Sequence, residues 1–345
     1  MEKVVVVTVT YNSHNFLKRC INSLVNQTYK LEKIIVIDNH SNEENYQKNL
    51  TLQSDLVEII YLDSNTGGAG GFEYGMTYSK KYNPDWVWIM DDDAFPTSDC
   101  LEKLLQHKDY ENLGCICPAI FGDDLKQYQV YHHKKMSKHF KERAAYNSYE
   151  EFPDVFEIDA NAFVGPLVKQ KVIDEIGVAD GGLFIYGDDT EYTYRISRKY
   201  KIILVKDAVI NHRDVIVNDS KNDYKAWWKE YYNHRNRYLL IDEYSESGFQ
   251  KFISIIKLKL YVRKRMLGSL LKKKYKGYRK VRLALYKQAL RDGKKGIKGK
   301  VIDPVAYNKQ FIKWFYNYPN RRIMYVRLFN CWFRLIWCYM CLWIK

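Results

Sequence analysis

The chain has 345 residues, 46% of them apolar, which is enough for one large globular domain with a sizeable core plus a smaller one. Its seven cysteines are odd in number and scattered, which argues against a small secreted fold held by disulfides. The first residues enter an apolar strand pattern without the cleavage site of a signal peptide. We therefore expect a protein of the reducing cytoplasm.

The net charge of +14 is unevenly distributed along the chain. Residues 251–345 hold 26 Lys and Arg against two acids, a net charge of +24, whereas residues 1–250 hold 29 basic and 39 acidic residues, a net charge of −10. Such asymmetry predicts a tail that meets an anionic partner, either nucleic acid or an anionic membrane surface. Because an acidic body would repel nucleic-acid phosphates, we expect the membrane surface and no nucleic acid.

Strand and helix patterns alternate over the first 120 residues. Helical spacing of apolar residues predicts a helix at Phe16–Asn26, and Gly71–Lys81 reads as another helix. Short apolar runs predict strands at Lys3–Val9, Ile34–Ile37, Val57–Leu62, Trp86–Met90 and Cys115–Ile120. This alternation predicts a mostly parallel sheet with helices on its faces.

The pattern is interrupted over residues 123–157, which are polar, charged and rich in Tyr, and we interpret them as an insertion or long loop over the sheet. Regular patterns then return, with strands predicted at Ala162–Lys169 and Ile202–Val205 and helices at Gln170–Ile176 and Thr190–Lys199. From about residue 222 the composition becomes aromatic and basic.

Three adjacent carboxylates, Asp91, Asp92 and Asp93, end the strand Trp86–Met90. Like charges so close together raise one another's pKa, and a hard divalent cation such as Mg²⁺ or Mn²⁺ relieves that cost. In open α/β sheets the carboxyl ends of strands are also where ligands bind. Taken alone, the pattern is compatible with a metal site and equally with a solvated acidic turn.

Polar residues also follow the first two strands. Thr10 and Asn12 end the first, and Asp38 ends the second. Side chains at the ends of adjacent parallel strands converge on the crevice where a nucleotide would lie. Helix capping by Asn12 or Asp38 is the simpler alternative.

A glycine-rich run follows the third strand, from Asn65 to Phe72, with four glycines in five positions at 67, 68, 70 and 71. As a loop, this run would let backbone N–H groups approach a phosphate closely. It contains no G-x-G-x-x-G pattern, which disfavours a dinucleotide oxidoreductase. A flexible turn is the alternative.

A second acidic group, Asp188 and Asp189, lies at a predicted helix start and is followed by Glu191. Acids there interact well with the helix dipole and can cap the helix, and one of them can also serve as a general base. His212 follows a further strand pattern and is a candidate metal ligand.

Taken in order, these motifs resemble an inverting family 2 glycosyltransferase of GT-A fold. The resemblance covers residues 1 to about 215 and is carried by Val-Thr-Tyr-Asn (9–12), Ile-Asp-Asn (37–39), Asn-x-Gly-Gly-x-Gly-Gly (65–71), Asp-Asp-Asp (91–93), Gly-Asp-Asp-x-Glu (187–191) and His212. It is strongest to bacterial galactofuranosyltransferases, with rhamnosyltransferases of surface-polysaccharide assembly close behind. Tyr231-Tyr232-x-x-Arg235-Asn236 is similar to the helix that follows the catalytic domain in these enzymes.

The resemblance implies a fold and a role for each matching residue. The fold is an α/β nucleotide-sugar-binding mixed sheet flanked by helices at 1–221, followed by a helical, basic and aromatic region at 222–345. The donor-binding residues would be Thr10, Asn12, Asp38, Asn65, Gly68, Gly70, Gly71, Asp91 and Asp92. Asp91, Asp93 and His212 would hold Mn²⁺ or Mg²⁺, and Asp189 would be the catalytic base, with Asp188 as the open alternative.

We therefore expect a transferase that moves galactofuranose from its UDP donor to a hydroxyl of a bacterial surface glycan carried on a polyprenyl diphosphate. A rhamnosyl or other hexosyl transferase with a dTDP or UDP donor is the nearest alternative. A nucleic-acid-binding protein or an inactive scaffold would leave the apparently complete set of acids unexplained.

The C-terminal residues 323–344 are mostly apolar and contain Trp332, Trp337 and Trp343. Their longest uninterrupted apolar run, Leu335–Ile344, has ten residues and is too short for the ~20 that span a bilayer. We expect a helix in the membrane interface, which would make the protein peripheral on the inner face of the cell membrane. The alternative is a helical subdomain that packs on the catalytic domain or on a second copy, giving a homodimer.

Overall fold

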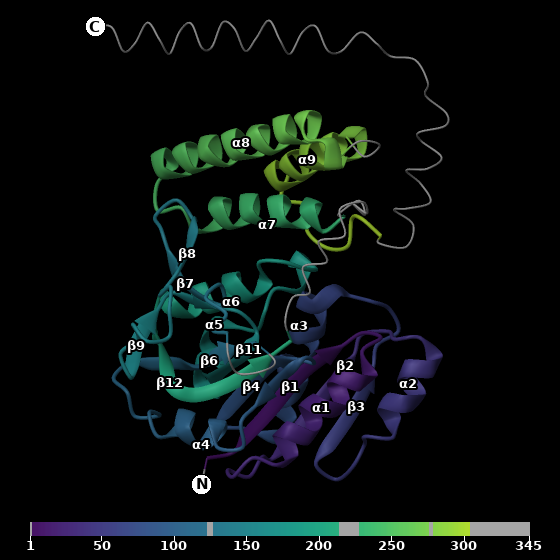
Figure 1. The fold of residues 1–345 in the computed structure, drawn as a ribbon, viewed down its shortest axis with the longest axis vertical. Helices are drawn as coiled ribbons and strands as arrows, with labels where there is room; N and C mark the ends of the chain where they lie inside the picture. The colour runs from purple at the N-terminus through teal and green to yellow at the C-terminus, as the bar shows by residue number, and fades with distance from the viewer. Residues whose placement is uncertain (1, 123–126, 214–227, 276–278, 304–345) are drawn as a thin grey trace, which may run out of the picture. The chain divides into compact units, whose positions relative to one another are not determined.

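The computed structural model describes residues 2–122, 127–213, 228–275 and 279–303, and residues 1–301 form one compact unit. Its centre is a mixed sheet with strand order β3-β2-β1-β4-β11-β6-β12-β5, and β9 pairs with β12 (Figure 1). The strands are β1 (Val4–Thr10), β2 (Lys33–Asp38), β3 (Val57–Tyr61), β4 (Trp86–Asp91), β5 (Ala94–Pro96), β6 (Leu113–Phe121), β9 (Val155–Ile158), β11 (Val164–Lys169) and β12 (Lys201–His212).

The first four strands of that order are parallel, and β11 runs antiparallel between β4 and β6. This confirms the predicted strands and the mixed sheet. The sequence of β4 is a continuous apolar run because both faces of this strand are buried in the core. Trp86, Trp88 and Met90 enter one core cluster, and Val87 and Ile89 enter the other.

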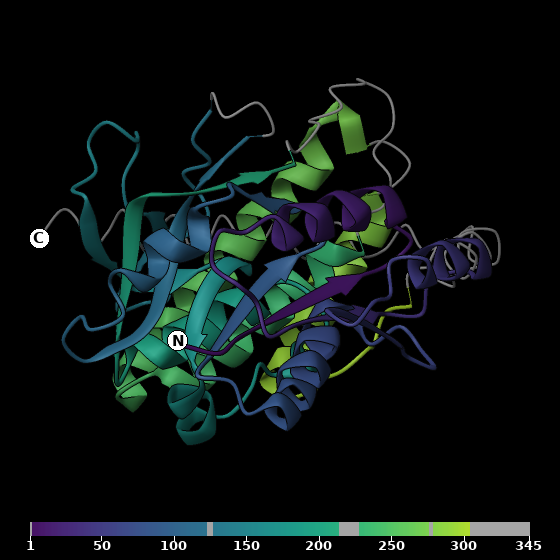
Figure 2. The same cartoon turned by 90° about the horizontal axis from the view of Figure 1, so that it is seen from below.

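Helices cover both faces of the sheet. On one face lie α1 (His14–Val25) and α4 (Cys100–Leu105), and on the other lie α3 (Gly67–Ser79), α5 (Gln170–Ile176) and α6 (Asp188–Ser197). Figure 2 shows α1 and α3 on opposite sides of the sheet. The short helix α2 (Glu43–Leu50) connects β2 to β3. Helices α1, α3, α5 and α6 were predicted, with shifts at some of their ends, whereas α2 and α4 were not.

The glycine-rich run is not a loop, contrary to the prediction. It forms the first turn of α3, which begins at Gly67 rather than at Gly71. A Cβ atom on Gly71 would lie 2.5 Å from Val9 Cγ1, and one on Gly75 would lie 2.5 Å from Val7 Cγ1. The missing side chains therefore let α3 lie directly against β1. This close packing accounts for Gly71 in the glycine-rich run and for Gly75, one turn further along α3.

The insertion at 123–157 has more structure than the sequence indicated. It contributes β7 (His133–Met136) and β8 (Glu142–Ala144), which form a small antiparallel sheet with β10 (Ala160–Asn161), and it also contributes β9. Strands of three or four residues are too short to show a period of two, so their pairing is set by tertiary contacts.

In the described part of the chain, three further helices follow the main sheet: α7 (Lys229–Tyr244), α8 (Gly248–Leu271) and α9 (Arg279–Lys294). They share a core that includes Tyr238 and Ile241 of α7, Val262 of α8 and Tyr286 of α9. Single 3₁₀ turns lie at Lys80–Tyr82, Gly181–Leu183 (η2) and Lys273–Tyr275. The boundary predicted between residues 221 and 222 lies outside the described residues.

Two further predictions bear on this chain's surroundings. Among the described residues, no helix is both long and apolar enough to cross a membrane. The predicted interfacial helix at 323–344 lies outside the described residues.

Cys20, Cys100, Cys115 and Cys117 are free and buried, as expected for cysteines that act as small apolar side chains.

Candidate active site

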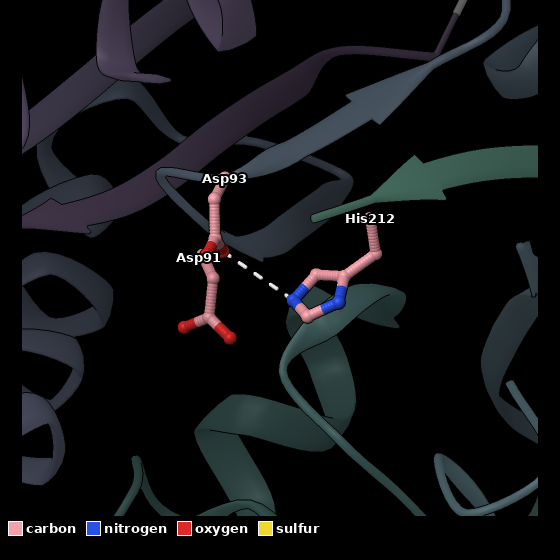
Figure 3. Close-up of side chains that lie close together, drawn as sticks. All are labelled: Asp91, Asp93 and His212. Atoms are coloured by element: carbon pink, nitrogen blue, oxygen red, sulfur yellow. Dashed lines mark ion pairs between the residues drawn. The ribbon is translucent and has the colours of Figure 1, made fainter. Parts of the chain in front are cut away.

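The ends of β4 and β12 bring three potential metal ligands together. Asp91 is the last residue of β4, Asp93 follows it, and His212 is the last residue of β12. The short strand β5 joins the two regions, because its Ala94 pairs with His212. One ligand atom from each of Asp91, Asp93 and His212 lies within 4.8 Å of the others, and Asp93 Oδ1 is 3.3 Å from His212 Nε2 (Figure 3).

The insertion orients His212. His212 Nδ1 lies 3.1 Å from Gln129 Oε1, and the same oxygen lies 2.8 Å from His132 Nε2. An amide oxygen can only accept, so His212 Nδ1 and His132 Nε2 each donate a hydrogen bond to Gln129 Oε1. In the neutral ring this leaves the lone pair of His212 on Nε2, the nitrogen that faces Asp93. Ligating histidines are commonly oriented by such a hydrogen bond, and no sequence pattern indicated Gln129.

Burial and neighbouring carboxylates raise the pKa values of Asp91 and Asp92, two of the three adjacent acids. Burial and then the charges of Asp93, Asp92, Asp189 and Asp188 raise the pKa of Asp91 well above its usual range. Burial raises the pKa of Asp92 to about 7, against hydrogen bonds that lower it. Two carboxylates and an imidazole nitrogen suit Mn²⁺, and a bound cation would remove the repulsion that raises these values. The residues present therefore fit the divalent cation that the sequence implied.

The predicted nucleoside-binding residues gather beside the triplet and also hold the local structure. Thr10 Oγ1 donates a hydrogen bond of 2.5 Å to Asp92 Oδ2. Asp38 is fully buried and accepts hydrogen bonds from the Ser41 N–H and the Asn49 side chain, each at 2.8 Å. Asn12 has a φ of 54° and its Oδ1 accepts from the Asn42 N–H. Asn12 and Asp38 thus hold the residues that lead into α2, whereas the N-cap of that helix is Asn42.

The start of α3 contacts residues 181–187, which lead to the adjacent acids Asp188 and Asp189 and which we call the acid-pair loop. Gly67 has a φ of +76°, and a Cβ atom there would lie 1.9 Å from the Phe184 carbonyl oxygen. Asn65 Oδ1 accepts from the Gly67 N–H at 2.9 Å. Gly68 has open space where a side chain would lie, and Gly70 faces the Thr66 side chain. Gly67 is thus the glycine whose conformation this contact requires, and it was absent from the predicted donor-binding set.

The acid pair, Asp188 and Asp189, occupies the first turn of α6, two residues before the predicted helix start. Burial and the neighbouring charge of Asp189 raise the pKa of Asp188 to about 7. Asp189 Oδ1 accepts from the Thr190 N–H at 2.6 Å. Because both acids raise the pKa of Asp91, the acid pair and the acidic triplet belong to one site.

A largely buried lysine from the insertion lies beside the acid pair. Lys134 Nζ donates to Thr190 Oγ1 at 2.5 Å and lies 3.9 Å from Asp189 Oδ2 and 3.3 Å from Glu142 Oε2. Burial alone would lower the pKa of Lys134, but the charges of Asp189, Glu142 and Asp188 outweigh it and raise that pKa. Lys134 therefore remains charged and supplies a compensating cation, which no sequence pattern indicated.

Helix α7 fixes the acid-pair loop. The Asn236 amide donates to the carbonyls of Leu183, Ile185 and Tyr186 at 2.7–3.0 Å, and the fully buried Arg235 donates to that of Leu183 at 2.8 Å. Phe184 and Tyr186 hold positive φ values of 66° and 65°. Such backbone is costly for residues other than glycine and persists only where its surroundings impose it. The Arg235-Asn236 motif thus shapes the turn that leads to Asp188.

Glu191, the last acid of the Gly-Asp-Asp-x-Glu motif, connects α6 to α7. It pairs with Arg195 Nε at 3.0 Å and accepts from the Tyr244 hydroxyl of α7. Arg195 also donates to the Ile176 and Val178 carbonyls at 2.7 and 2.9 Å. Within the described residues, Glu191 acts as a structural residue of this site.

Comparison with known proteins places this geometry in a family. The model of "Glycosyl transferase family 2" matches residues 5–177, half of the chain. Galactofuranosyltransferase GlfT1 of Mycolicibacterium smegmatis is 29% identical over 57% of this chain and 66% of its own length, so the chain spans just under two thirds of that relative. The dTDP-rhamnosyl transferase RfbF of Shigella flexneri is 24% identical over 68% of this chain and 78% of its own length.

The fold is shared with solved structures. A crystal structure of GalNAc-T7 with UDP, GalNAc and Mn²⁺ matches with a TM-score of 0.59 at 16% identity, over 86% of this chain and 57% of that one. The sheet, the flanking helices and the matching family model together show that the chain has the GT-A fold and belongs to glycosyl transferase family 2.

Proposed function

We propose that this chain is a metal-dependent inverting glycosyltransferase that moves galactofuranose from UDP-galactofuranose to a hydroxyl of a bacterial surface glycan. The acceptor would be carried on a polyprenyl diphosphate at the inner face of the cell membrane. The donor sugar is suggested by relatives named galactofuranosyltransferase, at 29% identity over 57% of the chain.

The observation that carries the proposal is the grouping of Asp91, Asp93 and His212 beside the acid pair. Their ligand atoms lie within 4.8 Å of one another, and the charges of Asp188 and Asp189 act on Asp91. Inverting transfer needs charge neutralisation on the leaving diphosphate and a base on the acceptor side. The site offers one group for each task.

In the proposed mechanism, Thr10, Asn12 and Asp38 line the nucleoside pocket, and Asp91, Asp93 and His212 hold the divalent cation. A cation held by these residues would supply positive charge to the leaving diphosphate. Asp189 removes the proton from the acceptor hydroxyl while its oxygen attacks the anomeric carbon. The bond from that carbon to the diphosphate oxygen breaks on the opposite face and releases UDP. Lys134 places a positive charge beside this acid, with its Nζ 3.9 Å from Asp189 Oδ2.

A panel of UDP- and dTDP-sugars tests this proposal, with nucleoside diphosphate release measured with Mn²⁺ and with EDTA. We expect Mn²⁺-dependent release from UDP-galactofuranose, faster with a lipid-linked glycan acceptor. Release that EDTA leaves unchanged would refute the metal requirement. Silence across the panel, with no donor binding by calorimetry, would refute the assigned donor class.

The second candidate is rhamnosyl transfer from dTDP-rhamnose. It is favoured by the relative RfbF, whose match covers a larger share of both chains, although at 24% identity. The same panel separates the two, because the donor that is turned over identifies the nucleotide and the sugar together.

A further inference from the structure

An exposed apolar stripe runs along α8. Its members recur every three or four residues, as one face of a helix requires. The α8 stripe consists of Phe249, Phe252, Ile256, Leu260, Leu267 and Leu271. Phe249 is 76% exposed, Phe252 60%, Leu260 56% and Leu271 71%.

The opposite face of α8 is the one that packs. Leu258 and Val262 are buried in the core shared with α7 and α9, and Arg265 pairs with Glu230 of α7 at 2.9 Å. Figure 1 shows α7 between α8 and the catalytic sheet. The α8 stripe is therefore a second apolar face, beyond the one that holds the helix in place.

Cations surround the α8 stripe. The helix carries six Lys and Arg and no acidic residue. Successive residues of a helix are 100° apart, which places Arg263 within the stripe, Lys257 and Lys264 along one edge and Lys259 along the other. Within the described part of the chain, no ion pair involves these four side chains, and all four are exposed.

We infer that the α8 stripe is a docking surface for an anionic lipid membrane. Apolar side chains flanked by Lys and Arg match the boundary between acyl chains and acidic headgroups. The catalytic region is net acidic, so this attraction would come from the helical region and would hold the acidic domain away from the lipid surface. The inference does not depend on which sugar the enzyme transfers.

Charge argues against the other occupants. A second copy packed through the same face would bring Lys257, Arg263 and Lys264 against their own counterparts, and like charges across an interface are costly. Nucleic acid would satisfy the cations and leave Phe249, Phe252 and Leu260 without an apolar partner.

The test is cosedimentation of the full chain with vesicles of phosphatidylcholine alone or mixed with phosphatidylglycerol. We expect binding to the anionic vesicles that weakens with salt. The double variant Phe252→Ser/Leu260→Ser should lower the partition coefficient by at least about tenfold, because two large apolar side chains no longer enter the interface. Lys257→Gln/Lys264→Gln should lower it by roughly fivefold for each lysine, and only on anionic vesicles.

Val25→Ser is the matched control, since Val25 is 52% exposed on α1, away from α8, and its loss should leave vesicle binding unchanged. Thermal melts and donor hydrolysis in solution establish that each variant is folded. Unchanged vesicle binding by the double variant would overturn the inference. If that variant instead turns a dimer into a monomer, the α8 stripe contacts a second copy. If it loses thermal stability while vesicle binding is unchanged, the stripe packs on another part of the chain.

Discussion

The proposed active site has two sides: a cation side, formed by Asp91, Asp93 and His212, and an acid-pair side, formed by Asp188 and Asp189. Different kinds of contact hold the two sides in place. Asp91 and His212 are terminal residues of buried strands, and the pairing of β5 with β12 fixes their separation. The acid pair instead depends on side chains from the insertion and from α7, which reach a turn with positive φ values. Sheet register therefore builds one half of the site, and long-range polar contacts build the other. If the proposed roles are right, damage to each half should have a different kinetic signature.

The largest effect should follow from Asp93→Asn, which removes a carboxylate ligand from the cation side. Donor binding and turnover should both weaken, and we expect kcat/KM to fall by roughly 10⁴-fold because the leaving diphosphate loses its compensating charge. Calorimetry with UDP and steady-state rates measure the two effects. Asp207→Asn makes the same charge change at an exposed position of β12 and should be silent.

Asp189→Asn should separate the two halves most cleanly. Removal of the base should lower kcat by ~10³-fold, within the usual range for general-base catalysis, and leave UDP affinity unchanged. The same measurements on Asp188→Asn decide between the two acids. Normal turnover by Asp189→Asn would show that the base is assigned to the wrong residue.

Gln129→Leu tests whether the insertion also supports the cation side. His212 would lose the acceptor that orients its ring, and we expect Mn²⁺ affinity to fall by about 10–100-fold, with kcat restored at high Mn²⁺ concentration. A Mn²⁺ titration of activity measures this effect. Gln127→Leu changes an exposed neighbour and should leave the titration curve in place.

Asn236→Ala removes the amide that holds the acid-pair loop. Three carbonyls would lose a buried donor, at a cost of roughly 1–3 kcal/mol in the free energy of unfolding, and kcat should fall by about tenfold with UDP affinity intact. Thermal melts and steady-state kinetics check both effects. Asn233→Ala, on the exposed side of the same helix, is the control, and an equal effect there would contradict a specific role for the loop contacts.

The smallest change should come from Lys134→Gln and should depend on pH. Lys134 lowers the pKa of Asp188, so its loss should raise that pKa further above about 7. If Asp188, the alternative base, accepts the proton, it must be deprotonated to act, so activity should fall most at low pH and recover as pH rises, with the acidic limb displaced upward. The kcat–pH profile measures the displacement. Lys134→Arg should restore the profile, whereas a merely structural loss would lower activity equally at all pH values.

The two halves also differ in how far the sequence predicted them. Asp91–Asp93 could be placed because a buried apolar strand precedes them, and the ordered motifs indicated His212 as their partner. The acid pair was located, but its support Lys134 was not, because it lies in a segment whose strands are too short to show a period. Gln129, which orients His212, lies in the same segment and was missed for the same reason. The contacts of Asn236 are with carbonyls about 50 residues away, and a carbonyl leaves no mark in the sequence.

The glycine-rich run was misjudged for a related reason. Glycine frequency predicts either a loop or close packing, and the sequence alone does not tell which. Here Gly71 and Gly75 lie against Val9 and Val7, and Gly67 lies against Phe184, so packing decides the conformation.

Calorimetric titration of UDP, with Mn²⁺ and with EDTA, tests the division of labour most directly when it is run on the wild type, Asp93→Asn and Asp189→Asn. The account predicts Mn²⁺-dependent binding of equal strength by the wild type and Asp189→Asn, and little or no binding by Asp93→Asn. UDP binding that is as strong in EDTA as with Mn²⁺, or binding by Asp93→Asn with Mn²⁺ as strong as that of the wild type, would contradict it.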